Sequence, residues 1–145
     1  MFQTVTGYIG AASMIALGIF AFTLGGRPER IGAGAYILGW IITVALGYAA
    51  DVVGVQWGTF GVDVIVLAAF GALVWKAPRS WPVWACALQL VAVASHIMLV
   101  VKLPTPVSAF YTVLNLTSYG ILIAIALGTF FAWQTRKAVG DAYVE

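Results

Sequence analysis

Five apolar stretches, four of about 20 residues and a longer fifth, dominate this chain and limit what it can fold into. A helix needs about 20 residues to cross the roughly 30 Å hydrocarbon core of a bilayer. The stretches cover residues 5–25, 31–50, 57–76, 81–101 and 107–133. Only 8% of the residues are charged, against about 25% in a soluble domain. We therefore expect an all-α polytopic membrane protein, in which residues 1–145 form a single domain of five transmembrane helices.

Four short breaks separate the expected spans. They read GGRPER, ADVVGVQ, KAPRSWP and KLPTP, and each combines charge, glycine or proline in the manner of a helix end. The second break is the weakest, because Asp51 alone marks its edge. Since all four breaks are short, consecutive helices should be antiparallel neighbours.

The positive charges orient the expected bundle. In a five-span layout, six of the seven Lys and Arg residues fall on one side and only Lys102 falls on the other. Short loops rich in Lys and Arg stay in the cytoplasm. We therefore expect the N-terminus outside and the C-terminus in the cytoplasm. Tryptophans are then expected in an aromatic belt at the inner interface: Trp75, Trp81, Trp84 and Trp133.

Polar side chains on three spans fall at a similar depth in the expected outer half of the membrane. Asp63 lies on the third span, His96 on the fourth and Asn115 on the fifth. Gln89 shares a helix face with His96, and Thr59 shares one with Asp63. A charged side chain at the bilayer centre costs roughly 2.5–3.5 kcal/mol on insertion scales, so it usually faces the bundle interior. We expect these five residues to form a polar intramembrane site, with Asp63 and His96 as a pair.

Two interpretations of this polar site stay open. It is a water-accessible pocket that opens to the outside, or it is an interhelical hydrogen-bond clamp worth about 0.6 kcal/mol per link. The first interpretation is supported by histidine, whose charge changes near neutral pH. The second span adds a further face with polar and aromatic side chains: Tyr36, Trp40, Thr43, Gly47 and Asp51.

Gly120, Ala124 and Gly128 form a ridge of small residues along the fifth span, spaced by four residues each time. Small residues let membrane helices approach closely. The ridge either packs helices within one chain or joins one chain to another.

Few cofactor or enzyme chemistries fit this composition. A bis-histidine haem needs two histidines, and the chain has only His96. A zinc site lacks ligands, and there is no nucleotide loop or nucleophile elbow. We expect no metal, no cofactor and no nucleic-acid partner. Enzymatic action on a lipid or a quinone stays open.

Three stretches, GGRPERIGA, WGTFGVDVIVLAA and WPVWACALQLVAVASH, together resemble uncharacterised small multi-pass inner-membrane proteins of bacteria. The pattern is a Pro-Glu-Arg turn after the first span, an aspartate in the third span, and a Trp-Pro start with a later Gln-Leu…His run in the fourth. The resemblance implies location in the bacterial inner membrane and brings no activity with it.

Our leading functional interpretation is a small accessory or assembly subunit of a bacterial inner-membrane complex, acting by lateral helix packing. Its partners would be the lipid bilayer and a larger membrane complex or copies of itself. The alternative is a small oligomeric transporter or channel whose polar site is Asp63, His96 and Asn115.

Overall fold

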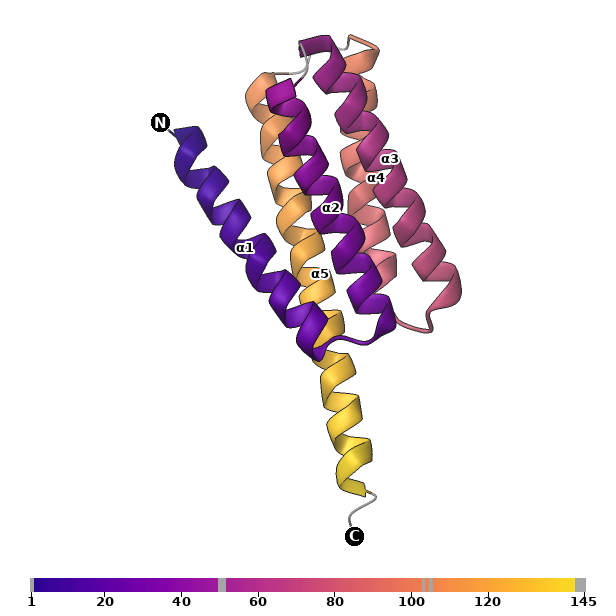
Figure 1. Ribbon diagram of the computed structural model, residues 1–145. Coiled ribbons are helices and arrows are strands. Elements are labelled where there is room, and N and C mark those ends of the chain that lie inside the picture. The colour runs from indigo at the N-terminus through magenta and orange to yellow at the C-terminus, as the bar shows by residue number, and fades with distance from the viewer. Residues whose placement is uncertain (1, 50–51, 103, 105, 143–145) are drawn as a thin grey trace.

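The computed structural model describes residues 2–49, 52–102, 104 and 106–142, and this part of the chain is all-helical (Figure 1). The helices are α1 (Phe2–Leu24), α2 (Arg27–Ala49), α3 (Val52–Lys76), α4 (Trp81–Val100) and α5 (Val107–Ala142). All five are long and apolar enough to cross a membrane, which confirms the expected all-helical fold with five such helices. Asp51 and the two ends of the expected domain lie outside the described residues.

Three helix boundaries differ from those expected by four residues or more. Helix α3 begins at Val52 rather than at residue 57. Helix α2 begins at Arg27 rather than at residue 31, because Pro28 suits a first helical turn and the Glu29 carboxylate favours a helix N-terminus. Helix α5 continues to Ala142 rather than ending near residue 133. Its 36 residues correspond to about 54 Å at 1.5 Å per residue, so its C-terminal part projects beyond the other helices (Figure 1).

Consecutive helices run in opposite directions and pack against one another (Figure 1). Helix α5 also contacts α1 and α2, which closes the bundle. Helix α1 joins the bundle through its C-terminal half, where Met14, Leu17 and Ala21 are buried. Its N-terminal half diverges from the other helices (Figure 1), and a Cβ added at Gly7 or Gly10 would meet nothing within 4 Å.

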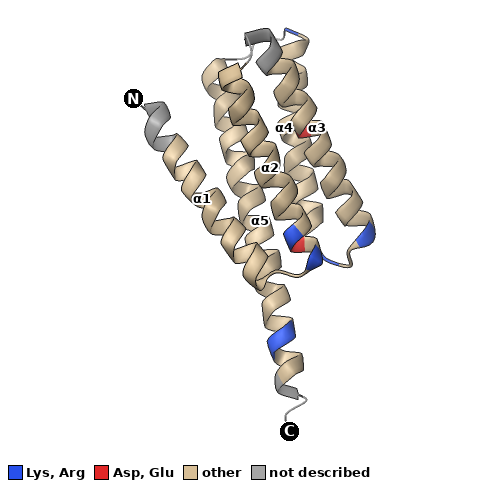
Figure 2. Ribbon diagram, viewed as in Figure 1, with Lys and Arg blue, Asp and Glu red and all other residues tan. Residues whose placement is uncertain are grey.

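The positive charges gather at the end of the bundle where the α1–α2 and α3–α4 connections lie (Figure 2). We call this the basic end. Arg136 of α5 donates a hydrogen bond to the Leu24 backbone carbonyl oxygen there. This bond ties the projecting helix to the end of α1. Lys102 lies at the opposite end of the bundle, with a positive φ of 56°.

An apolar core fills the middle of the bundle. Phe70, Ile121 and Ile125 are at most 1% exposed. The Tyr36 and Phe70 rings stack with centroids 6.2 Å apart. The Phe70 and Trp81 rings meet edge to face with centroids 6.4 Å apart. This row of rings connects α2, α3 and α4 from the centre of the bundle to the basic end.

Candidate functional site: a polar pocket among four helices

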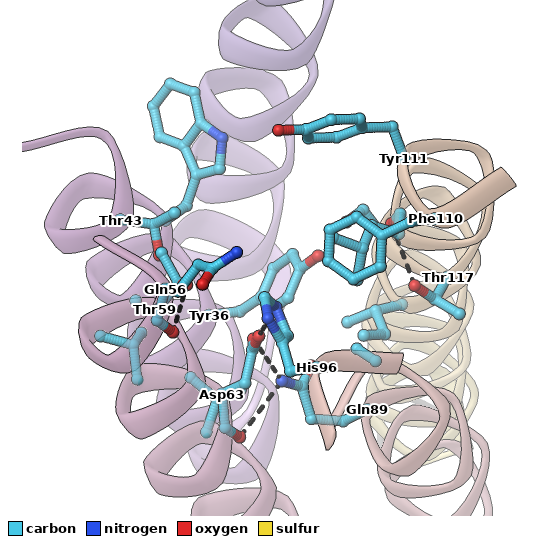
Figure 3. A pocket seen from close by; sticks show the side chains of 18 of the residues that line it. Tyr36, Thr43, Gln56, Thr59, Asp63, Gln89, His96, Phe110, Tyr111 and Thr117 are labelled. Carbon is cyan, nitrogen blue, oxygen red and sulfur yellow. Dashed lines mark hydrogen bonds and ion pairs between the residues drawn. The ribbon is translucent and has the colours of Figure 1, made fainter. Parts of the chain in front are cut away.

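A cavity of about 410 Å³ lies among α2, α3, α4 and α5, in the half of the bundle away from the basic end (Figure 3). Its volume is within the range of 300–1,000 Å³ that is usual for ligand pockets. Buried Val66 and Ile121 lie at its deep end. Exposed Gln56, Val107 and Tyr111, near the ends of their helices, form its rim. The cavity therefore opens at the end of the bundle that carries Lys102.

Asp63, His96 and Gln89 form a connected polar group on the wall of this cavity (Figure 3). His96 Nε2 lies 2.9 Å from Asp63 Oδ2. Gln89 Nε2 donates to Asp63 Oδ1 at 2.8 Å and to the Asp63 backbone carbonyl oxygen at 3.2 Å. Each carboxylate oxygen of Asp63 thus has a nitrogen partner, and the side chain remains 25% exposed. The structure brings these three sequence-predicted residues together.

The packing of antiparallel helices explains this meeting. Gln89 and His96 are seven residues apart, so they lie two turns apart on one face of α4. That face packs against α3, which carries Asp63. At the deep end of the pocket, Gly39 of α2 lets α3 come close, because a Cβ at this position would lie only 2.8 Å from Val66 Cγ2.

Hydroxyl groups from three helices add to the polar lining. Thr43 of α2 and Thr59 of α3 both line the cavity, and Thr59 Oγ1 donates to the Gln56 carbonyl oxygen at 3.1 Å. Tyr36 of α2 and Ser118 of α5 also line the cavity. Thr59 thus lies in the same pocket as Asp63 and His96, as predicted from the sequence.

Aromatic rings form much of the remaining wall. Tyr36 and Trp40 come from α2, and Phe110 and Tyr111 come from α5. The Phe110 ring meets the His96 ring edge to face, with centroids 5.3 Å apart. The part played by Phe110 was missed, since nothing in the sequence distinguishes it from a phenylalanine that faces lipid.

The structure does not bring Asn115 into this group, which corrects our expectation. Asn115 is exposed and is not among the residues that line the cavity. The pocket face of α5 is centred near Leu114 and Ile121, with Tyr111 at its edge. Each helical residue advances by about 100°, so Asn115 lies a further 40° or so around the helix from Tyr111, away from the pocket.

A second polar cluster, not expected from the sequence, lies at the basic end. Glu29 is 0% exposed. Its carboxylate accepts hydrogen bonds from Trp81 Nε1 and from the Gly26 backbone N–H, both at 2.9 Å. Arg79 Nε lies 3.3 Å from the same carboxylate. This cluster joins the α1–α2 connection to the α3–α4 connection.

Trp81 therefore belongs to the core rather than to the expected interfacial belt. It is 5% exposed, whereas Trp75 is 91% exposed and Trp84 is 68% exposed. Two glycines make room for its ring: a Cβ added at Gly32 would lie 3.2 Å from Trp81 Cζ3, and one at Gly128 would lie 2.8 Å from Nε1. The signal that we missed is the PER sequence, an acidic residue in the first turn of a helix.

The ridge of small residues on α5 packs within the chain. A Cβ added at Gly120 would lie 2.7 Å from Leu88 Cδ1 of α4. Ala124 is 8% exposed and belongs to the apolar core, and Gly128 faces Trp81 of α4. The close approach of α4 and α5 thus depends on the small side chains of this ridge.

Within the described residues, no three His, Cys, Asp or Glu side chains gather in the manner of metal ligands. Comparison of the chain with protein-family models, curated proteins and solved structures gives no match. The resemblance noted above therefore stays a prediction, and function has to be argued from the pocket.

Proposed function

We propose that this chain is a five-span protein of the bacterial inner membrane that binds a small amphipathic molecule in a pocket open to the outer face. The observation that carries the proposal is the Asp63–His96–Gln89 group, in which Gln89 and His96 are buried, on the wall of a cavity of about 410 Å³. Ligand pockets are mostly apolar with a few polar groups that converge. Intramembrane ionisable residues are costly and usually serve a site.

The proposed orientation places the basic end in the cytoplasm. It rests on the gathering of Lys and Arg at one end of the bundle (Figure 2), since positive loops remain on the cytoplasmic side. The N-terminus is then outside and the C-terminus inside. A reporter fused after Glu145 should be active only in the cytoplasm, and one fused at the N-terminus should be active only outside. An N-terminus and a C-terminus on the same side would contradict the orientation.

Binding fits the pocket better than conduction does. Phe70, Ile121 and Ile125 fill the bundle between the cavity and the basic end, each at most 1% exposed. The cavity is therefore blind at its deep end. A channel or transporter, which was our alternative from the sequence, would need this packed layer to open.

The test compares a blocked pocket with a matched control. Thr43→Trp places a bulky ring in the lining, whereas Thr112→Trp makes the same change at an exposed position of α5 outside it. Each variant is purified in mild detergent, and the retained small molecules are identified by mass spectrometry. We expect the wild type and Thr112→Trp to retain a compound that Thr43→Trp loses. Identical retention by all three proteins would count against a binding pocket.

The second candidate is the accessory or assembly subunit expected from the sequence. It is supported by α1, whose N-terminal half diverges from the bundle (Figure 1). In that half Tyr8 is 73% exposed and Ile9 is 52% exposed, and Ile15 further along α1 is 63% exposed, so this helix offers an apolar face for lateral packing. A mild-detergent pull-down should then recover a larger membrane protein in fixed stoichiometry. Recovery of this chain alone would favour the binding function.

A further inference from the structure

The lining of the pocket combines aromatic rings with a carboxylate. Tyr36, Trp40, Phe110 and Tyr111 contribute rings from two helices, and Asp63 contributes the carboxylate. Aromatic faces attract cations through the negative charge of their π systems, most strongly where water is excluded. A carboxylate beside such rings adds a charge that favours the same ligand.

The charge of the pocket depends on His96. Among the described residues, the ionisable side chains that line the pocket are the Tyr36 phenol from α2, the Asp63 carboxylate from α3, the His96 imidazole from α4 and the Tyr111 phenol from α5. With a proton on His96, the pair with Asp63 is neutral overall. Without that proton, the pocket carries one negative charge. Histidine is the side chain whose ordinary range of titration includes physiological pH.

We infer that the pocket binds a small organic cation, an ammonium group on an apolar body, in exchange for the proton on His96. This inference rests on the proposed binding function and names its ligand class. When the cation enters, the His96 imidazolium releases its Nδ1 proton to the outside solvent, and the neutral ring still donates its Nε2–H to Asp63. The Asp63 carboxylate, 2.9 Å from that nitrogen, then faces the cation. One positive charge enters and one leaves, so the net charge of the occupied pocket is unchanged.

The position of the pair suits such an exchange. His96 is 8% exposed and is held between Asp63 on one side and the Phe110 ring on another. The Asp63 side chain is 25% exposed to the cavity, so a ligand can reach it. Gln89 keeps its hydrogen bond to Oδ1 and holds the carboxylate in place. An anion in the same pocket would face the carboxylate and be repelled.

Three probes of similar size separate charge from shape. Phenyltrimethylammonium is a cation, tert-butylbenzene is its neutral isostere, and benzenesulfonate is an anion. Binding is measured by calorimetry on the purified protein in detergent at pH 8 and at pH 5.5. The Thr43→Trp variant under the same conditions gives the signal due to partition into the micelle, which is subtracted.

At pH 8 we expect phenyltrimethylammonium to bind at least about tenfold more tightly than tert-butylbenzene. This preference should weaken at pH 5.5, where the proton competes. Asp63→Asn should remove the preference and keep the neutral probe bound. His96→Gln should keep the preference and remove its dependence on pH. Circular dichroism and size-exclusion chromatography establish that each variant is folded.

The outcomes separate this inference from the proposed function. If the neutral isostere or the anion binds as tightly as the cation, the binding function stands and the cation inference is overturned. If the preference for the cation is the same at both pH values, the exchange with the proton is overturned. If no probe binds the wild type more than it binds Thr43→Trp, the pocket is not a binding site and both proposals fail.

Discussion

Two carboxylates lie in opposite halves of this bundle, and their surroundings differ. Glu29 is 0% exposed and meets three donors, from Trp81, Arg79 and the Gly26 backbone. The Asp63 side chain is 25% exposed and borders a cavity of about 410 Å³. A carboxylate enclosed by donors on all sides holds helices together. One that faces an open cavity remains available for a ligand.

The largest effect should come from Glu29→Ala at the enclosed site. This change leaves the Trp81 N–H and the Arg79 guanidinium without their acceptor. Buried donors without partners and broken buried ion pairs are costly, so we expect a loss of about 3 kcal/mol in the free energy of unfolding. The measurement is reversible unfolding in mixed detergent and SDS micelles, followed by circular dichroism. A loss below about 1 kcal/mol would show that the cluster does not hold the basic end together.

The next effect should come from Gly128→Ala, which tests how tightly Trp81 is packed. The added methyl would overlap the Trp81 ring, with Nε1 only 2.8 Å away, and overpacking of this kind costs about 1–3 kcal/mol. Gly71→Ala is the matched control, because a Cβ there meets nothing within 4 Å. It should be neutral or stabilise the protein by up to about 1 kcal/mol. Equal stabilities for the two variants would contradict the packing of Trp81 against α5.

A smaller effect is expected from Trp81→Phe. The phenylalanine keeps an aromatic ring in the core but cannot donate a hydrogen bond to Glu29. We expect the free energy of unfolding to fall by about 1–2 kcal/mol. Trp84→Phe makes the same change at a side chain that is 68% exposed, and its unfolding free energy should match that of the wild type. If the two variants unfold alike, the bond to Glu29 contributes nothing measurable.

The smallest effect is expected at the open end of the bundle, from Asn115→Leu. Asn115 is exposed and lies outside the pocket lining, so an apolar side chain there should change the unfolding free energy by less than about 0.5 kcal/mol. Its binding of phenyltrimethylammonium should equal that of the wild type. A loss of binding would restore Asn115 to the site.

The polar group at the pocket was predictable from the sequence, because each of its members can be recognised within its own helix. Asp63, Gln89 and His96 stand out as polar residues in apolar runs, and their helical spacing and depth indicate that they meet. Asn115 is also a polar residue at a similar depth, yet it lies outside the pocket. Depth along the chain does not fix the rotation of α5 about its own axis. That rotation is set by packing, here by side chains such as Leu114 and Ile121 that face the pocket.

The cluster around Glu29 at the basic end was not predictable by the same reasoning. Glu29 stands in a short polar break that looks like a loop, and Trp81 lies where an interfacial tryptophan is expected. Their hydrogen bond joins residues 52 positions apart in the sequence, and it forms only once α2 and α4 are packed together. The two glycines that flank the Trp81 ring come from α2 and α5, so nothing local in the sequence links them to it.

The most direct test of the difference between the two carboxylates is to replace each by its amide and measure the free energy of unfolding in the same micelles. Asp63→Asn should cost less than about 0.5 kcal/mol, because the amide oxygen still accepts from Gln89, the ring nitrogen of a neutral His96 can accept from the new NH2 group, and a charge in the proposed membrane span is removed. Glu29→Gln should cost about 2 kcal/mol, because a neutral amide cannot replace the ion pair with Arg79. Its NH2 group would also face an N–H donor that now binds a carboxylate oxygen. An Asp63→Asn variant at least as destabilised as Glu29→Gln would mean that Asp63 holds helices together, and the assignment of the two ends would be wrong.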